Sequence, residues 1–326
     1  MKNVSILILE TSVIEAIADP HYMFKAVNQF LVSSGKPPLF DVQLVAITKE
    51  VKLENSLYTV HAEKLLKDVH KTDLIFIPAI SGDIPAALKL NKDYMPWIVN
   101  QYKNGAEVAS LCIGAFVLAA TGLLNGKKCS SHWNAANEFR TMFPEVELVD
   151  GSILTEEQGI YSSGGANSYW SLLLYLVEKY TDRDTAILAS KFFAVDIDRD
   201  SQASFMMFKG QKEHDDREIL KVQEFIEENY QEKITVDELA ARVSIGRRSF
   251  ERRFKKATNN TVVEYMQRVK IEAAKRSFES SRKNINEVMF DVGYTDTKAF
   301  RTIFKKITGL TPVEYRNKYN KQGMVE

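Results

Sequence analysis

Cysteine is scarce in this chain, which contains only two cysteines among its 326 residues. Two cysteines without a paired spacing exclude a disulfide-rich secreted scaffold and favour a reducing compartment. Long apolar runs are absent as well, since no stretch approaches the roughly 18–20 apolar residues that cross a membrane. The apolar start of the chain is interrupted by Glu10 and lacks a small-residue cleavage pattern, so it predicts a strand rather than a secretory signal. We therefore expect a cytoplasmic protein that does not enter a membrane.

Motifs for phosphate, cofactor and metal binding are also missing. No GxGxxG sequence follows an apolar strand, and no Walker-type sequence occurs. Four of the histidines, His21, His61, His70 and His214, do not have the spacing of metal ligands. The sequence therefore predicts no cofactor and no metal ion.

Net charge is absent overall, because 43 Lys and Arg residues balance 43 Asp and Glu residues. This balance hides an asymmetry along the chain. Residues 246–326 contain 19 basic and 9 acidic residues, whereas residues 1–245 contain 24 basic and 34 acidic residues. A basic C-terminal end attracts phosphates, and an acidic body discourages non-specific binding through the other end. The asymmetry favours a nucleic-acid partner for the C-terminal part.

One sequence pattern occurs twice near the C-terminus. The segment VDELAARVSIGRRSFERRF at residues 236–254 recurs as INEVMFDVGYTDTKAFRTIF at residues 285–304, with one residue inserted in the turn. Phe250 and Phe300 occupy equivalent places in the apolar stripe of the second helix of each copy. A short helix, a tight turn and a second helix with a basic outer face are typical of a helix-turn-helix unit. Two such units predict a protein that contacts double-stranded DNA twice.

The second helix of each unit has a polar face opposite its apolar stripe, at about 100° per residue. In the first unit this face consists of Arg248, Glu251, Arg252 and Lys255. In the second unit it consists of Lys298, Arg301, Thr302 and Lys305. Arg and Lys pair with guanine edges, and Thr pairs with base edges or a thymine methyl group. An ordinary solvated helix face is the alternative, but two faces with matching geometry favour DNA binding.

The residues between the two units predict one long helix. Thr261 and Glu264 have the spacing of a capping box, and the run that follows reaches about residue 281 without Gly or Pro. A helix of this length can hold two recognition helices roughly one DNA turn apart. About 100 residues, including VGYTDTKAFRTIFKKITGLTPVEYR, resemble the AraC/XylS family of transcription regulators. Gly246 departs from the family pattern, which usually has a Ser that caps the first recognition helix.

Short runs rich in Val, Ile and Leu alternate with helical stretches in the N-terminal part of the chain. Four of these runs, VSILILE, VQLVAIT, LIFIPAI and AEVASL, are typical of strands buried on both faces. This alternation predicts a mostly parallel α/β sandwich. The expected fold class is therefore α/β for the N-terminal part, followed by an all-α C-terminal part with two helix-turn-helix units.

The strand AEVASL ends at Cys112, and a helix begins directly after it. A cysteine between strand and helix has the position of a nucleophile elbow, where backbone N–H groups can lower the thiol pKa. His132 follows the next turn and could lie beside Cys112. The run SLCIGAFVLAATGLLNGKKCSSHW resembles the ThiJ/PfpI branch of the class I glutamine amidotransferase-like superfamily, which implies a flavodoxin-like fold over roughly residues 1–200. Regulators with this architecture have an Arg and a Gln that match Arg199 and Gln202, without a role that the sequence reveals.

In enzymes of this superfamily a cysteine, a histidine and an acidic residue cooperate, and the matching residues here are Cys112, His132 and Glu15. Ala79 and Ile80 replace an expected Gly-Gly pair, so the backbone donors for an oxyanion are not secured. A Cys–His pair without a third group is weak support for catalysis. We therefore expect a ligand pocket rather than an enzyme. The predicted ligand contacts are Cys112, Ile113, His132 and Trp133.

These predictions combine in a two-domain transcription regulator. Residues 1–208 are expected to form an effector-binding domain, residues 209–217 a polar linker and residues 218–326 the DNA-binding domain. A small-molecule effector would act on a homodimer, and the family resemblance implies activation together with RNA polymerase. The competing hypothesis is a cysteine-dependent amidase or hydrolase with a DNA-binding appendage. A further alternative is redox sensing, with Cys129 as the resolving partner of Cys112.

Overall fold

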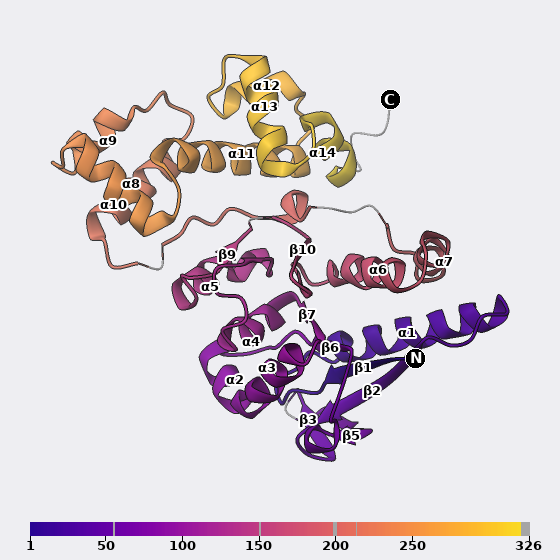
Figure 1. Cartoon of the computed structure of the whole chain (residues 1–326). Helices are drawn as coiled ribbons and strands as arrows, with labels where there is room; N and C mark the ends of the chain where they lie inside the picture. The colour runs from indigo at the N-terminus through magenta and orange to yellow at the C-terminus, as the bar shows by residue number, and fades with distance from the viewer. Residues whose placement is uncertain (55, 150, 198–200, 213, 321–326) are drawn as a thin grey trace. The chain divides into compact units, whose positions relative to one another are not determined.

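The computed structural model divides the chain into two compact units, Met1–Gln202 and Ala203–Glu326 (Figure 1). It describes all residues apart from 55, 150, 198–200, 213 and 321–326. The division falls after Gln202 rather than after residue 208. The segment 209–217, which the sequence interpretation treats as a linker, lies within the second unit, where Asp216 caps a helix. Residue 213 of that segment is outside the described residues.

A seven-stranded sheet forms the centre of the first unit, with the order β10-β11-β7-β6-β1-β2-β5. All neighbouring pairs in it are parallel except β10 with β11. Its strands are β1 (Lys2–Leu7), β2 (Phe40–Ala46), β5 (Lys64–Leu65), β6 (Leu74–Ile77), β7 (Glu107–Leu111), β10 (Leu154–Glu157) and β11 (Ile160–Ser163). Two further pairs are β3 (Glu50–Leu53) with β4 (Tyr58–His61) and β8 (Lys128–Cys129) with β9 (Glu147–Leu148). Every residue of β6 is buried, as expected for a strand covered on both faces.

Helices cover both faces of this sheet (Figure 1). They are α1 (Glu15–Ser33), α2 (Ile84–Leu90), α3 (Met95–Lys103), α4 (Ala115–Ala120), α5 (Ala136–Met142), α6 (Tyr169–Tyr180) and α7 (Arg183–Phe193). One hydrophobic core contains Phe24 of α1 and Leu173 of α6, and a second contains Phe116 of α4 and Phe139 of α5. The sheet separates these two cores, which confirms the prediction of a mostly parallel α/β sandwich.

The second unit is helical in its described part, and α11 connects the group α8–α10 with the group α12–α14 (Figure 1). Its helices are α8 (Arg217–Glu228), α9 (Val236–Arg242), α10 (Arg247–Thr258), α11 (Val262–Ser280), α12 (Ile285–Asp291), α13 (Thr297–Thr308) and α14 (Pro312–Tyr319). Phe250 and Phe254 belong to one hydrophobic core, and Phe300 and Phe304 belong to another. The predicted double helix-turn-helix arrangement is confirmed.

Side-chain caps fix the starts of these helices. Capping boxes form at Thr235, Thr261, Asn284 and Thr311. The two recognition helices differ from each other at this point. Helix α13 follows Asp296, whose carboxylate accepts a hydrogen bond from the N–H of Ala299, whereas α10 follows Gly246, which has no side chain to offer. The first recognition helix therefore starts without the stabilising bond that the second one has.

None of the described helices combines the length and the apolar character that crossing a membrane requires. Within the same part of the chain, no group of three or more His, Cys, Asp or Glu side chains is arranged to hold a metal ion.

Candidate DNA interface and effector site

Helix α10 buries one side against α11 and exposes the other. Phe250 and Phe254 are fully buried, with ring centroids 5.8 Å apart, and Phe254 contacts Tyr265 of α11 at 5.3 Å. The four residues singled out for DNA contact, Arg248, Glu251, Arg252 and Lys255, are all exposed. The apolar stripe thus fixes the helix in place, and the polar face is available to a partner.

The charged residues around α10 do not all have the same surroundings. Arg247 forms ion pairs with Asp237 of α9 at 2.9 Å and with Glu251 at 3.4 Å. Glu251 is therefore engaged by its own helix, and its negative charge repels phosphate. Among the described residues, Arg248 and Arg252 form no ion pair within 4 Å. These two guanidinium groups are the ones best placed to pair with bases or phosphates.

Helix α13 repeats this arrangement in the second half of the unit. Phe300 contacts Tyr294 at 5.4 Å between ring centroids, and Phe304 contacts Phe278 of α11 at 5.6 Å. The opposite face exposes Lys298, Arg301, Thr302 and Lys305. One helix, α11, therefore supports both recognition helices, each through an aromatic stripe and each with its basic face outward.

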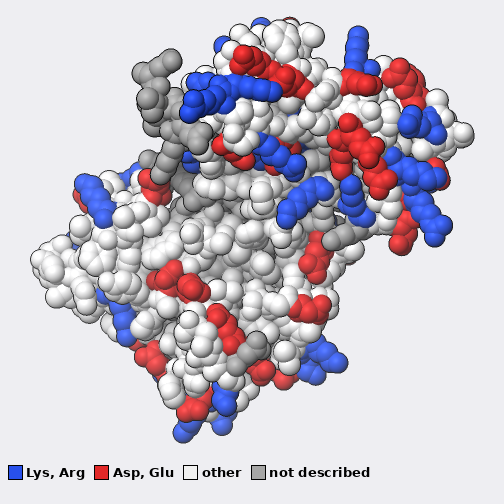
Figure 2. Space-filling model, turned by 180° about the vertical axis from the view of Figure 1, so that it is seen from behind, with Lys and Arg blue, Asp and Glu red and all other residues white. Residues whose placement is uncertain are grey.

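The surface of the helical unit carries charges of both signs. On the side shown in Figure 2, Lys and Arg side chains lie among Asp and Glu side chains over this unit. A uniformly basic surface is therefore not what this side offers to a polyanion. Attraction to DNA therefore depends on the positions of the basic residues on α10 and α13. Such localised charge favours a complex with one orientation over non-specific binding.

Cys112 stands at a sharp turn between β7 and α4. Its φ angle is 54°, in the left-handed region, and a short 3-10 turn, Cys112–Gly114, leads into the helix. A β-carbon on Gly114 would lie 2.4 Å from the carbonyl oxygen of Pro78, so only glycine lets the helix start approach β6 this closely. The predicted strand–turn–helix position of the cysteine is confirmed.

The Cys112 thiol does not have the lowered pKa that this position suggested. Burial raises the pKa of Cys112 to about 12, and a backbone hydrogen bond from Ile113 offsets only part of the increase. Burial likewise raises the pKa of Cys129 to about 12. The expectation of a lowered pKa is wrong because desolvation outweighs the N–H groups at the helix start. Both cysteines are free, and both are protonated thiols at neutral pH.

The other two proposed catalytic residues are not paired with Cys112: His132 is hydrogen-bonded to Asn134, and Glu15 is exposed. His132 Nδ1 accepts a hydrogen bond from the N–H of Asn134 at 3.1 Å, and its ring lies 5.5 Å from that of Trp133. Burial lowers the pKa of His132, which favours its neutral form. Glu15 is exposed in the first turn of α1. In the described part of the chain, no hydrogen bond joins either residue to Cys112.

The sequence interpretation missed Tyr169, which lies near Cys112, and Asp19, which is bound to Tyr169. The Tyr169 hydroxyl donates to Asp19 Oδ2 at 2.6 Å, and Tyr169 interacts electrostatically with both Glu15 and Cys112. Burial raises the pKa of Asp19, although hydrogen bonds from Tyr169 and Trp170 oppose the increase. The spacing of Glu15 and Asp19, four residues apart on one helix, is the signal that could have revealed the second carboxylate.

Gln202 is buried, with 2% of its surface exposed. Its Nε2 donates to the carbonyl oxygens of Ser131 at 3.2 Å and Ser152 at 2.7 Å. These two bonds fix which way the amide points, and its Oε1 has no hydrogen-bond partner among the described residues. A β-carbon on Gly164 would lie 1.8 Å from this Nε2, so the glycine makes room for the amide. Arg199, the other matching position, lies outside the described residues.

Comparison with known proteins gives one family match within each of the two units. The model of the DJ-1/PfpI family matches residues 30–179, and that of a helix-turn-helix domain matches residues 239–318. The chain therefore joins a DJ-1/PfpI domain to a helix-turn-helix domain. The crystal structure of a ThiJ/PfpI family protein from Pseudomonas syringae covers 62% of this chain and 78% of its own, with 17% identity and a TM-score of 0.50, a likeness of fold.

Relatives with both parts are transcriptional regulators by name. The HTH-type transcriptional regulator GbdR of Pseudomonas aeruginosa is 23% identical over 238 residues, which is 73% of this chain. The regulator CdhR of the same organism is 22% identical over 259 residues, covering 79% of this chain and 76% of its own length. The match covers 65% of the length of GbdR, so the activity of that whole protein does not transfer directly.

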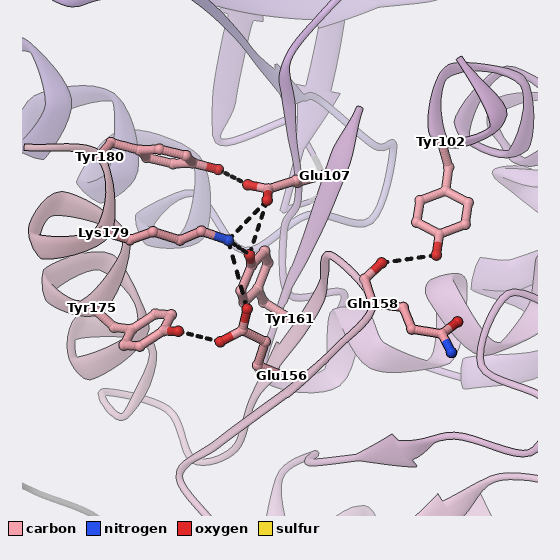
Figure 3. Close-up of polar contacts among 8 residues, drawn as sticks. All are labelled: Tyr102, Glu107, Glu156, Gln158, Tyr161, Tyr175, Lys179 and Tyr180. Carbon is pink, nitrogen blue, oxygen red and sulfur yellow. Dashed lines mark hydrogen bonds and ion pairs between the residues drawn. The ribbon is translucent and has the colours of Figure 1, made fainter. Parts of the chain in front are cut away.

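A polar network joins α6 of the DJ-1/PfpI domain to strands β7, β10 and β11 of the sheet (Figure 3). Lys179 Nζ forms ion pairs with Glu107 at 2.8 Å and with Glu156 at 3.6 Å, and the Tyr180 hydroxyl also donates to Glu107. Burial acts to raise the pKa of Glu107, but these bonds from Lys179 and Tyr180 lower it overall. Because α6 begins with Tyr169, the network helps to position one side of the region around Cys112.

Ala79 and Ile80, which replace the expected Gly-Gly pair, are buried in the DJ-1/PfpI domain. The carbonyl oxygen of Ala79 accepts a hydrogen bond from the N–H of Val13 at 2.9 Å, and Ile80 forms a β-bridge with Ser12. The segment is thus engaged in packing and backbone pairing with the loop before α1.

Proposed function

We propose that this protein is a sequence-specific DNA-binding transcription regulator whose DJ-1/PfpI domain binds a small-molecule effector. The observation that carries the proposal is the pair of exposed basic faces on α10 and α13, both supported by α11. Side chains of this type pair with base edges in the major groove and with phosphates. The proposed DNA contacts are Arg248, Arg252, Lys255, Lys298, Arg301, Thr302 and Lys305, with Glu251 at the edge of the first face.

The two faces favour a partner that offers two adjacent grooves. Helix α11 contains 19 residues, which at about 1.5 Å per residue is long enough to separate two recognition helices by roughly one turn of DNA. The names of the relatives GbdR and CdhR support transcription as the process. We further propose a cytoplasmic homodimer that activates transcription together with RNA polymerase.

The test begins with selection of an operator from a random duplex library by the full chain. The double variant Arg252→Ala/Arg301→Ala is expected to lose the preference for that operator over random DNA, because each base-reading residue contributes roughly 1–3 kcal/mol of discrimination. The matched control Lys221→Ala/Lys233→Ala removes the same charge from exposed positions outside the two recognition helices. Equal loss of preference in both double variants would refute the assignment of the recognition faces.

Ligand binding, rather than catalysis, is the proposed role of the region around Cys112. The raised pKa of Cys112 argues against a thiolate nucleophile, and His132 Nδ1 is engaged by the N–H of Asn134. The proposed ligand contacts are Cys112, Ile113, His132 and Trp133. A thermal-shift screen with amines, amino acids and quaternary ammonium compounds tests the binding role.

Cys112→Ala separates the binding role from the enzymatic alternative. The compound that stabilises the wild-type chain in the screen is expected to stabilise this variant as well and still to change its operator affinity. A variant that bound the compound but no longer responded to it would favour cysteine chemistry in the domain instead.

A further inference from the structure

The residues that follow the DJ-1/PfpI domain are bound along α11 of the second unit. We call residues 203–212 the strap. The carbonyl oxygen of Met206 accepts a hydrogen bond from Lys275 Nζ at 2.5 Å, and the N–H of Phe208 donates to Glu272 Oε2 at 3.0 Å. As the strap advances, its contacts on α11 move back toward the start of that helix. The strap therefore runs antiparallel to the helix that supports both recognition helices.

A buried ion pair anchors the centre of the strap. Lys275 Nζ and Glu272 Oε2 are 2.8 Å apart, and their side chains are only 5% and 11% exposed. Burial of two charges is favourable only when further hydrogen bonds satisfy them. The backbone groups of Met206 and Phe208 supply two of these bonds. The buried charges of Lys275 and Glu272 consequently have these hydrogen-bond partners only when the strap is docked on α11.

The two ends of the strap contact opposite halves of the DNA-binding unit. Near its start, the carbonyl oxygen of Ser204 accepts a hydrogen bond from the Tyr319 hydroxyl of α14 at 3.0 Å. Near its end, the carbonyl oxygen of Gln211 accepts from Gln223 Nε2 of α8 at 2.9 Å, and its side-chain oxygen accepts from Asn260 Nδ2 at 3.1 Å. The strap thus spans from the second helix-turn-helix unit to the first.

The chain has almost no slack between the strap and the DJ-1/PfpI domain. Ser201 forms a β-bridge with Ser152, and the N–H of Gln202 donates to the carbonyl oxygen of Gly151 at 2.7 Å. Ala203, the first residue of the strap, follows the anchored Gln202 directly, and the carbonyl oxygen of Ser204 is already bound to Tyr319. Successive α-carbons are about 3.8 Å apart, so a shift of Gln202 by a few ångströms must be taken up within the strap.

We propose that the strap relays the state of the effector site to the DNA-binding unit, with Gln202 as its input. This inference rests on the proposed function. Gln202 Nε2 binds the carbonyl oxygen of Ser131, and the Ser131 hydroxyl donates to the carbonyl oxygen of Cys112 at 3.4 Å. An effector bound beside Cys112 shifts these hydrogen-bonded groups. Gln202 moves with them and pulls on the strap through the backbone. The strap then leaves α11, the Lys275–Glu272 pair loses its backbone partners, and the two helix-turn-helix units are joined by α11 alone, without the strap that also contacts both.

Hydrogen exchange of the full chain, measured by mass spectrometry without DNA or effector, tests the input. In Gln202→Ala, amides of residues 203–212 are expected to exchange at least about tenfold faster than in the wild type, because the strap is docked less of the time. Ser130→Ala is the matched control. It also removes a hydrogen bond to the carbonyl oxygen of Ser152, at 2.5 Å, but from a side chain outside the connection. Gln202→Asn, a milder change, is expected to act in the same direction as Gln202→Ala.

The same measurement tests the docking of the strap on α11. Lys275→Met/Glu272→Gln removes both buried charges together and is expected to increase exchange in residues 203–212 while α10 and α13 keep their protection. Lys283→Met/Asp291→Asn removes a different ion pair of the unit, 2.7 Å long, and is expected to leave the strap unchanged.

The relay is refuted if residues 203–212 exchange as fast as an unstructured peptide in the wild type. It is equally refuted if neither Gln202 variant affects them, or if Ser130→Ala affects them as much. A chain that passes these tests but selects no operator would refute the proposed function and leave the docked strap in place.

Discussion

Arg253 and Asp216 form a two-point ion pair between α10 and the start of α8. Arg253 Nε and Nη2 donate to Asp216 Oδ2 and Oδ1 at 2.9 and 2.6 Å, and Asp216 Oδ1 also accepts from the N–H of Ile219. The pair ties the first recognition helix to the cap of a neighbouring helix. Its neighbour in sequence, Arg252, is exposed and forms no ion pair with a described residue. Of these two adjacent arginines, Arg253 stabilises the packing of the helix and Arg252 remains available to a partner.

Arg252→Ala is expected to weaken binding to the selected operator by about 1–3 kcal/mol and to relax sequence preference at one base position. Its melting temperature is expected to stay close to that of the wild type, because the side chain is exposed. Gel-shift titrations on specific and random duplexes measure the effect. An equal loss on both duplexes would identify Arg252 as a phosphate contact instead.

Arg253→Ala is expected to lower the stability of the helical unit, and more strongly near neutral pH than in acid. The hydrogen bond from Arg253 is the main cause that lowers the pKa of Asp216. A carboxylate with a lowered pKa stabilises the fold above its unfolded pKa of about 3.9 and loses that contribution as the pH falls through the folded value. In thermal melts at decreasing pH, the difference between wild type and variant should therefore shrink as the pH falls below the unfolded pKa of about 3.9. A difference that stayed constant with pH would contradict the assignment.

Phe300→Ala is expected to lower the free energy of unfolding of the helical unit by about 3–5 kcal/mol, as for other large aromatic residues removed from a core. Phe300 is fully buried in the hydrophobic core that also contains Phe304. Lys298→Ala, two residues earlier and exposed, should leave stability nearly unchanged and weaken DNA binding. Paired denaturation and gel-shift measurements compare them, and the opposite result would overturn the orientation of α13.

Native Cys112 and Cys129 are expected to resist iodoacetamide at pH 8, reacting roughly 100-fold or more slowly than in the unfolded chain, because only the thiolate reacts. Burial raises both pKa values to about 12. Since unfolded thiols have a pKa of about 8.5, the folded state retains protons that the unfolded state releases, and stability should fall as the pH rises above about 8.5. Peptide mapping identifies the modified thiol. Rapid alkylation of Cys112 in the folded chain would revive its role as a nucleophile.

A fragment that begins at Ala203 is expected to be more stable than one that begins at His214. The shorter fragment lacks the backbone partners of Lys275 and Glu272, and hydrogen bonds to charged groups contribute about 1.5–3 kcal/mol each. Urea denaturation of the two fragments measures the difference. If the two midpoints coincided, the strap would contribute nothing to the stability of the unit.

The parts of the fold with a strong period could be predicted from the sequence. Phe250 and Phe254 repeat as Phe300 and Phe304, and a helical stripe of this kind can be buried in only one orientation. The turn at Cys112 was also visible, because an apolar strand runs directly into an apolar helix. What composition could not supply was the thiol pKa, which depends on burial in three dimensions.

The strap escaped prediction for a different physical reason. Most of its hydrogen bonds use backbone groups, the carbonyl oxygens of Met206 and Gln211 and the N–H of Phe208, which do not depend on the type of side chain. The polar segment 209–217 therefore has the composition of a flexible linker although it is bound to the helical unit. The contact of Asp19 with Tyr169 and the contacts of Gln202 with Ser131 and Ser152 were hidden likewise, since these partners are distant in sequence.

The position of the strap determines at which residue the sensor domain of such a protein can be exchanged for another. A chimera that receives a new sensor domain by a junction within residues 209–217 would place a foreign segment along α11, without the Phe208 ring that packs against Tyr265. A junction between Gln202 and Ala203 transfers the strap together with the helices that hold it. Exchange of sensors, in the laboratory or between genes, should therefore succeed at the position where the polypeptide looks least like a linker.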